Sequence, residues 1–198
     1  EVFQFQSAEL VAPATYELSH LLRAQAGTEG AMRAPLAPGA RVVLIDAAVA
    51  RVDMGADDVG LVFNWKVGPA RRAIGDASYA DATHAFAGVG LRPLSPVHVR
   101  GVRDAGGDLS LAWVRRTRID GDSWDTVEVP LGEASERYEV DILSGATVVR
   151  TLASTTPAVT YTAADQAADF GTPPSSCAVR VHQLGATYGR GAAASATV

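Results

Sequence analysis

The sequence predicts an all-β protein, with a small β-sheet or barrel-like module over residues 1–90 and a seven-stranded sandwich over residues 91–198. Short runs of alternating apolar and polar residues recur along the chain, and glycine, proline and aspartate separate most of them. No segment beyond residue 90 favours a helix. We place the domain boundary in residues 88–96, because two glycines and two prolines within nine residues interrupt helices and strands alike.

Four or five strands are expected in the first module. Residues 2–6 and 16–22 alternate, and residues 59–67 place every second apolar side chain on one face. Residues 41–46 form a nearly continuous apolar run, which is consistent with a strand buried on both faces. A last strand is expected at residues 83–86. These strands suggest a sheet that is incomplete and continues from a region upstream.

Seven strands are expected in the second module, at residues 97–102, 108–113, 137–142, 147–150, 158–162, 177–182 and 192–198. Their alternation predicts one buried and one charged face for each sheet. The predicted core residues are Leu109, Leu111, Trp113, Tyr138, Val140, Ile142, Val179 and Val181. Seven such strands in about 105 residues are typical of an immunoglobulin-like sandwich.

Composition and charge exclude several classes of protein. The formal charge of −5 disfavours binding to a phosphate backbone. No apolar run approaches the ~18 residues that a membrane span needs. The single cysteine, Cys177, excludes an intrachain disulfide and a cysteine-based metal site. The chain begins with Glu1 and shows no leader-like segment, so we expect a processed product or a fragment of a longer polypeptide.

No sequence motif indicates catalysis, so we expect neither enzymatic activity nor a cofactor. The chain has no Gly-x-Ser-x-Gly, no His-Glu-x-x-His and no glycine-rich phosphate loop before Lys66. Residues 120–125 resemble a calcium loop in part, but Trp124 stands where a third ligand is needed and no glutamate closes the loop. A turn at the tip of a hairpin is the favoured interpretation, and no metal site is predicted.

The candidate interface residues are Arg115, Arg116, Arg118 and Trp124. Together with Arg100 and Arg103, the three arginines form the densest basic cluster, which could bind phosphate or lipopolysaccharide. The favoured alternative is salt bridging, within the domain or across a subunit contact, to Asp120, Asp122, Asp125, Glu133 and Glu136. Trp124 is either packed or presented as an interface anchor.

The second module resembles a fibronectin type III domain. Leu109-x-Leu111-x-Trp113 is similar to that family's second strand, and Tyr138-x-Val140-x-Ile142 to its third. Val179-x-Val181 and the glycines at 189 and 191 are similar to its sixth strand and the turn that follows. Two features depart from the pattern. Cys177 stands where the family has its corner tyrosine, and residues 117–133 are a long insert.

Longer strings resemble the C-terminal part of the baseplate hub of gene transfer agents and related siphophages, also called the megatron or host-specificity protein. They are residues 21–29, 39–46, 84–98, 113–124 and 129–133. The resemblance implies a non-enzymatic structural component of a phage-like tail tip, assembled in the bacterial cytoplasm, which supports tail assembly and host-cell attachment. The implied partners are further copies in a trimer around the tail axis, distal tail, baseplate or fibre proteins, and a host surface glycan or protein.

Two other functions stay open at this point. A carbohydrate- or surface-binding accessory module of a secreted bacterial enzyme should show an exposed row of aromatic side chains on one sheet face. A hydrolase should show a deep polar pocket with a preorganised acid–base pair.

Overall fold

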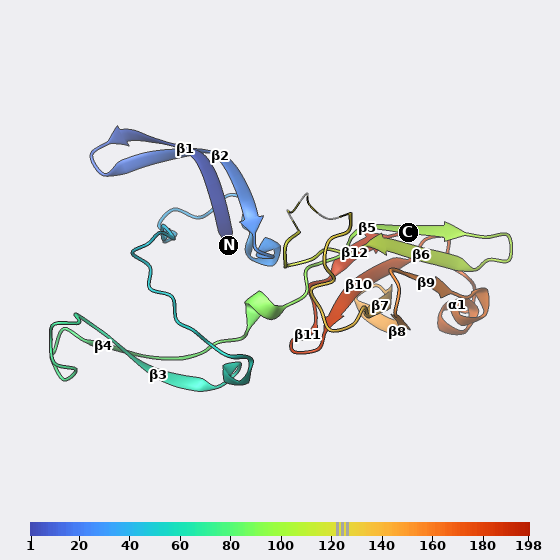
Figure 1. The fold of residues 1–198 in the computed structure, drawn as a ribbon. Helices are drawn as coiled ribbons and strands as arrows, with labels where there is room; N and C mark the ends of the chain where they lie inside the picture. Colours follow the sequence, from blue (N-terminus) through green and yellow to red (C-terminus); the bar gives the residue numbers. More distant parts are fainter. Residues whose placement is uncertain (122, 124, 126) are drawn as a thin grey trace. The chain divides into compact units, whose positions relative to one another are not determined.

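The computed structural model describes residues 1–121, 123, 125 and 127–198, and it confirms an all-β fold (Figure 1). The chain divides into two compact units, one made of Glu1–Pro35 with Gly90–Val198 and the other of Leu36–Val89. The expected division into domains 1–90 and 91–198 stays a prediction.

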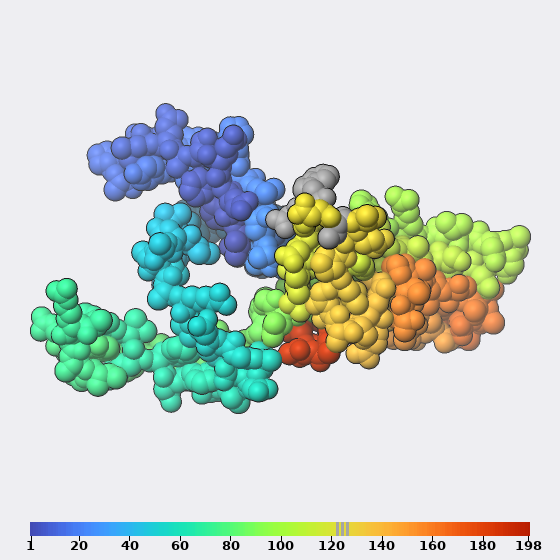
Figure 2. Space-filling view, viewed as in Figure 1, coloured from blue at the N-terminus to red at the C-terminus, as the bar shows by residue number. Residues whose placement is uncertain are grey.

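A sandwich of two antiparallel sheets forms the largest part of the first unit. One sheet has the order β5 (Val97–Arg103), β6 (Leu109–Val114), β9 (Ala158–Tyr161). The other contains β8 (Thr147–Ser154), β7 (Tyr138–Ser144) and β10 (Ala178–Gly185), with β11 (Gly189–Arg190) and β12 (Ala194–Thr197) both paired to β10. This strand order is fibronectin type III-like. In the space-filling view, yellow and orange atoms of β7, β8 and the following segment form the near face of the sandwich (Figure 2).

The core lies between the two sheets and is built by the alternating side chains of β6, β7 and β10. All eight residues predicted for the core are at most 5% exposed. The Trp113 ring packs edge-on against Tyr138, with 5.1 Å between ring centroids. Each strand therefore turns one face inward, as its two-residue period requires.

One helix, α1 (Ala163–Phe170), joins β9 to β10 and was not expected from the sequence. Thr162 caps it by accepting the Asp165 amide at 3.1 Å, and Gly171 ends it with a φ of 78°. The Gln166 side chain is buried and donates to the Tyr161 carbonyl at 2.8 Å. At eight residues the helix is too short to show a clear apolar period.

The last residue of the chain is held in the sandwich by Cys177. The Cys177 amide donates to the Val198 carbonyl at 2.7 Å, and the Val198 amide donates back to the Cys177 carbonyl at 2.9 Å. The Cys177 side chain is buried, and that burial raises the pKa of its thiol.

A long hairpin of β1 (Val2–Ala12) and β2 (Thr15–Gln25) precedes the sandwich in the first unit. Both strands extend beyond the predicted segments 2–6 and 16–22. A short 3₁₀ turn, η1 (Glu29–Ala31), follows the hairpin, and another, η3 (Val89–Leu91), precedes the sandwich.

The second unit holds η2 (Ala56–Asp58) and one hairpin, β3 (Val62–Val67) with β4 (Ala80–Ala85), among the described residues. Trp65 packs edge-on against Phe86, with 5.5 Å between ring centroids. The prediction of a strand buried on both faces at residues 41–46 is wrong. These residues form no strand, and the four apolar side chains from Val42 to Ile45 are 62–72% exposed. An apolar run indicates that a segment needs burial, but none of the strands described in the structure pairs with residues 41–46.

The core predicts a clear difference between two aliphatic truncations. Leu111→Ala should lower the free energy of unfolding by about 3 kcal/mol, because it leaves a cavity between the sheets. Val102→Ala, on an exposed site of β5, should change it by less than about 0.5 kcal/mol. Denaturant unfolding followed by tryptophan fluorescence measures both. Equal losses would contradict this assignment of the core.

Candidate interaction surface

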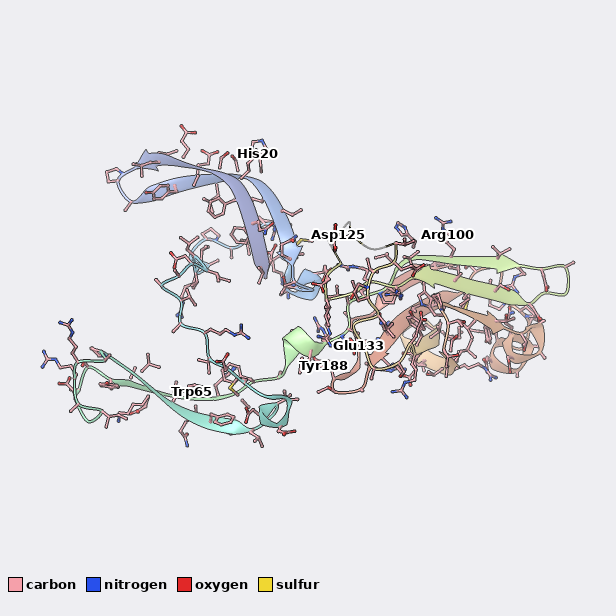
Figure 3. All side chains as sticks on the ribbon, viewed as in Figure 1. His20, Trp65, Arg100, Asp125, Glu133 and Tyr188 are labelled. Atoms are coloured by element: carbon pink, nitrogen blue, oxygen red, sulfur yellow. The ribbon has the colours of Figure 1, made fainter. Side chains whose placement is uncertain are left out.

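Of the three arginines predicted at an interface, Arg115 fastens the insert to the end of β6, and Arg118 ties the two ends of the insert together. The guanidinium of Arg115 donates to the carbonyls of Val129 at 2.7 Å and Pro130 at 3.0 Å. Arg118 Nε donates to Glu133 Oε1 at 3.1 Å, and the Glu133 side chain is nearly buried (Figure 3). Arg115 therefore holds the insert backbone, and Arg118 holds the insert backbone and the nearly buried Glu133 carboxylate.

The third arginine, Arg116, reaches the base of the β1–β2 hairpin. Its Nη1 lies 2.7 Å from Glu29 Oε1 in η1. Arg92 adds a second link, donating to the Gly27 carbonyl at 3.3 Å. Burial disfavours ionisation of Glu29, but a backbone hydrogen bond and Arg116 outweigh it, so the pKa of this carboxyl lies below its ordinary value.

Of the acidic partners considered for the basic cluster, only Glu133 is paired with one of its arginines among the described residues. Glu29 and Glu128 also pair with arginines of the cluster, Arg116 and Arg115 respectively. The sequence gave no sign of the Glu29 contact, because only folding brings this residue close to Arg116. Trp124, like Asp122, lies outside the described residues, so its role as an anchor stays a prediction. The described part of the chain contains no group of three His, Cys, Asp or Glu placed to hold a metal ion.

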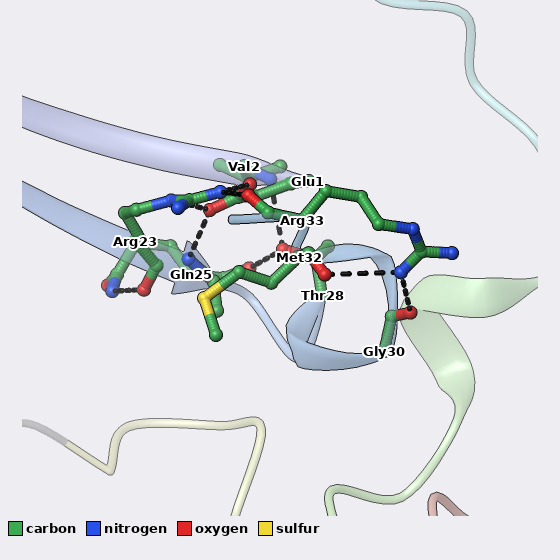
Figure 4. A network of polar contacts seen from close by, with 9 residues as sticks. Glu1, Val2, Arg23, Gln25, Thr28, Gly30, Met32 and Arg33 are labelled. Carbon is green, nitrogen blue, oxygen red and sulfur yellow. Dashed lines mark hydrogen bonds and ion pairs between the residues drawn. The ribbon is translucent and has the colours of Figure 1, made fainter. Parts of the chain in front are cut away.

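The hairpin base is closed by a second ionic contact at the start of the chain (Figure 4). Arg23 binds Glu1 through two hydrogen bonds, Nε to Oε1 at 2.7 Å and Nη2 to Oε2 at 2.6 Å. The Arg23 hydrogen bond lowers the pKa of the Glu1 carboxyl. The Val2 amide donates to the Thr28 hydroxyl at 2.9 Å, which ties β1 to the turn after β2.

Beyond its base, the hairpin exposes apolar side chains. Leu10 and Tyr16 face each other across the two strands and are each 60% exposed. Leu22 on the same hairpin is also exposed. A two-stranded hairpin is marginally stable in water unless a face is covered. The apolar pair therefore forms a candidate contact surface.

A charged network covers the outer face of the sheet where β7, β8 and β10 meet. Asp141 receives two hydrogen bonds from Arg190, at 2.7 and 2.8 Å, and a third from the Thr151 hydroxyl at 2.7 Å. Arg190 also donates to Glu139 Oε2 at 2.5 Å. His182 Nε2 lies 3.7 Å from Asp141 Oδ2. The hydrogen bonds from Arg190 lower the pKa of the Asp141 carboxyl, against the opposing effect of burial.

No described aromatic side chain of residues 90–198 is exposed. Trp113, Tyr138 and Tyr161 all belong to the core. The exposed row of aromatics that an accessory glycan-binding module should show is therefore missing from the described part of the sandwich.

None of the helices in the described part of the chain is long and apolar enough to cross a bilayer.

Comparison with known families gives one match. A family model described as Rcc01698-like, C-terminal, matches residues 1–43, which contain the β1–β2 hairpin. No curated protein matches the chain.

Solved structures similar to the chain include domains d3–d4 of the rat CD45 extracellular region. That pair has a TM-score of 0.37 and 12% identity, and the match covers 97% of this chain and 93% of that chain. The FN5 domain of Drosophila Lar has a TM-score of 0.29 and 15% identity, covering 54% of this chain and 96% of that chain. The fibronectin type III-like architecture of the sandwich is evident from its own strand order.

Removing the Arg118 side chain should destabilise the protein. Arg118→Ala leaves the nearly buried Glu133 carboxylate without its cation, at a cost of about 1 kcal/mol. Thermal unfolding should show a lower midpoint for this variant. Arg100→Ala is the control, because the Arg100 side chain points away from β5 (Figure 3). Equal midpoints for the two variants would show that the insert does not depend on Arg118.

The Asp141–Arg190 pair predicts a further loss of stability. The Asp141 side chain is 5% exposed, so Arg190→Ala leaves a buried carboxylate without its cation. The cost should be about 2 kcal/mol, below the ~3–5 kcal/mol of fully buried pairs, because water can replace a guanidinium that is 41% exposed. Arg180→Ala on β10 is the matched control, and urea unfolding of both variants measures the difference.

The same pair predicts the direction of a pH dependence. The pKa of Asp141 is lower in the folded than in the unfolded protein, so its contribution is complete above the unfolded pKa of about 3.9 and is lost as the pH falls through the folded value. Unfolding free energies measured from about pH 5 to pH 2 should therefore fall more steeply for the unmodified protein than for Arg190→Ala. Parallel curves would contradict this account.

Proposed function

We propose that this chain is a structural component of a phage-like tail tip or baseplate hub, where it supports tail assembly and host-cell attachment. One observation carries the proposal. The segment matched by the Rcc01698-like family model, a family related to gene transfer agents, also presents the exposed apolar pair of the hairpin. A contact between subunits buries apolar side chains that are exposed in the single chain. The hairpin offers such side chains within the segment that the family model matches.

The sandwich suits such a role because its core is closed and its loops and strand edges remain available. A rigid β-scaffold can carry contact surfaces without a cofactor or a reaction. In this proposal the chain is not an enzyme, and its partners are further copies arranged as a trimer around the tail axis and the distal tail, baseplate or fibre proteins. Attachment would bring it to a host surface glycan or protein.

Residues 42–45 add a structural argument for the assembly role, and the first two of them lie within the segment that the family model matches. Four consecutive apolar side chains that are mostly exposed are costly to leave in water. An extended apolar segment can add to the sheet of a neighbouring chain through its backbone. We therefore assign this segment and, separately, the hairpin to surfaces that are buried on assembly.

The experiment removes the apolar pair from the complete tail protein. The double variant Leu10→Ser with Tyr16→Ser should fold normally, because both side chains are exposed, but should fail to co-purify with tail particles. Val102→Ser, which changes an equally exposed apolar residue of β5, should co-purify at normal stoichiometry. Circular dichroism verifies folding of each variant.

Measuring how well the assembled particles adsorb to cells separates the role in tail assembly from the role in host-cell attachment. Normal adsorption by particles that carry Val102→Ser is expected. Full incorporation of the double variant into particles would contradict the assignment of the hairpin as an assembly surface. A complete absence of the unmodified chain from tail particles would contradict the proposed function itself.

A further inference from the structure

A shallow depression of about 490 Å³ lies on the outer face of the sheet where β7, β8 and β10 come together. Its volume falls within the ~300–1,000 Å³ that is usual for small-molecule sites. Its lining is formed by Arg137, Glu139, Ala153, Ser154, Thr155 and Leu184, together with Tyr138, which is fully buried. The depression therefore combines a cation, a carboxylate, two hydroxyls and two apolar side chains.

The strand register brings these side chains to one face. Glu139 pairs with Ala153 across β7 and β8. Arg137 precedes Glu139 by two positions and so shares its face, and the Arg137 carbonyl accepts the Leu184 amide at 2.9 Å. Glu139, Ala153, Ser154 and Leu184 lie within three strands of the sheet, and Arg137 and Thr155 lie directly beside the ends of β7 and β8, so the sheet positions the lining, which is what a preorganised site needs.

Arg137 is the cationic group that this site leaves available. Its side chain is exposed, and no acceptor for its guanidinium is found in the described part of the chain. Arg190, by contrast, is fully engaged by Asp141 and Glu139. A free guanidinium fork matches the two oxygens of a carboxylate.

Glu139 supplies an acceptor next to that cation. Its carboxylate is 31% exposed and is held in place by Arg190, which binds Oε2. Oε1 is then free to accept a ligand hydroxyl. The exposed Thr155 hydroxyl can donate or accept, whereas Ser154 Oγ already donates to the Ala158 carbonyl at 2.7 Å. Leu184 and Ala153 offer a small apolar surface to C–H groups.

The balance of charge selects the type of anion. Among the residues that line the depression, Arg137 is the cation and Glu139 the carboxylate, so the site has no excess positive charge to hold a dianion such as phosphate. A monoanion that also carries hydroxyl groups would satisfy both Arg137 and Glu139. Because no described aromatic side chain is exposed on this sheet, recognition here depends on charge and hydrogen bonds, not on ring stacking.

We propose that this depression binds an acidic sugar unit of the hexuronate type, with the sugar carboxylate on Arg137 and a ring hydroxyl on Glu139. The site lies in the sandwich, on residues 137–190, and the inference goes beyond the assembly role of the hairpin. It holds whether or not the chain is incorporated into a tail.

The test is a titration of the complete chain, labelled with ¹⁵N, with sodium glucuronate, followed by amide chemical shifts. Shifts should be confined to β7, β8 and the end of β10. Glucose, which lacks the carboxylate, and acetate, which lacks the hydroxyls, should each bind at least about tenfold more weakly, because each loses one set of charge-assisted hydrogen bonds.

Two variants locate the contact. Arg137→Ala should weaken glucuronate binding about tenfold, because it removes the charged hydrogen bonds to the carboxylate. Arg180→Ala, which removes a second arginine from the same face of the sheet, should leave binding within about twofold. Unchanged amide spectra of the free variants verify their folding.

Four results would overturn the proposal. Glucose binding as tightly as glucuronate would remove the role of Arg137, and acetate binding as tightly would reduce the site to an unspecific anion contact. An unaltered affinity in Arg137→Ala, or the absence of any shift at high glucuronate concentration, would exclude the site altogether. None of these results bears on whether the hairpin variants enter tail particles.

Discussion

The contact of β6 with β7 and β10 across the sandwich is the interaction on which the other features depend. Leu111 and Trp113 from one sheet close against Val140 and Val181 from the other, and water is excluded between them. Because the inner faces are used mainly for this packing, the charged groups occupy the outer faces and the ends, while Gln183 is a buried polar side chain on β10. The ionic network around Asp141, the insert and the depression near Arg137 all lie on the outside of that core.

Arginine is the means by which loops and chain ends are attached to this scaffold. Arg115 holds two carbonyl groups, Arg118 a buried carboxylate, and Arg23 the first residue of the chain. The planar guanidinium suits this because it presents several donors in fixed directions to carbonyl and carboxylate oxygens. An abundance of arginine in this sequence therefore does not by itself indicate a surface that binds anions, and availability has to be judged side chain by side chain.

The sequence predicted the strands of the sandwich well, because a half-buried strand alternates with a period of two and residues 137–142 show that period without interruption. It failed at residues 41–46, since an apolar run indicates burial but does not identify a partner. It also missed α1, although Thr162, Asp165 and Gly171 carry the signals of a capped start and a glycine end. For the candidate interaction surface, the sequence indicated that arginines would pair with acidic side chains, as Arg118 does with Glu133. The pairing of Arg116 with Glu29 was not foreseeable, because it joins segments that only folding brings together.

Two backbone hydrogen bonds hold Val198 next to Cys177, which carries the only thiol in the sequence. The reactivity of this thiol therefore depends on whether that segment stays in place. In the closed protein the sulfur is shielded and its raised pKa keeps it protonated, so it reacts slowly with alkylating reagents. Each time the terminal segment detaches, the sulfur becomes accessible. The labelling rate of an otherwise unmodified sample thus records how often this edge of the sandwich opens, without an added probe.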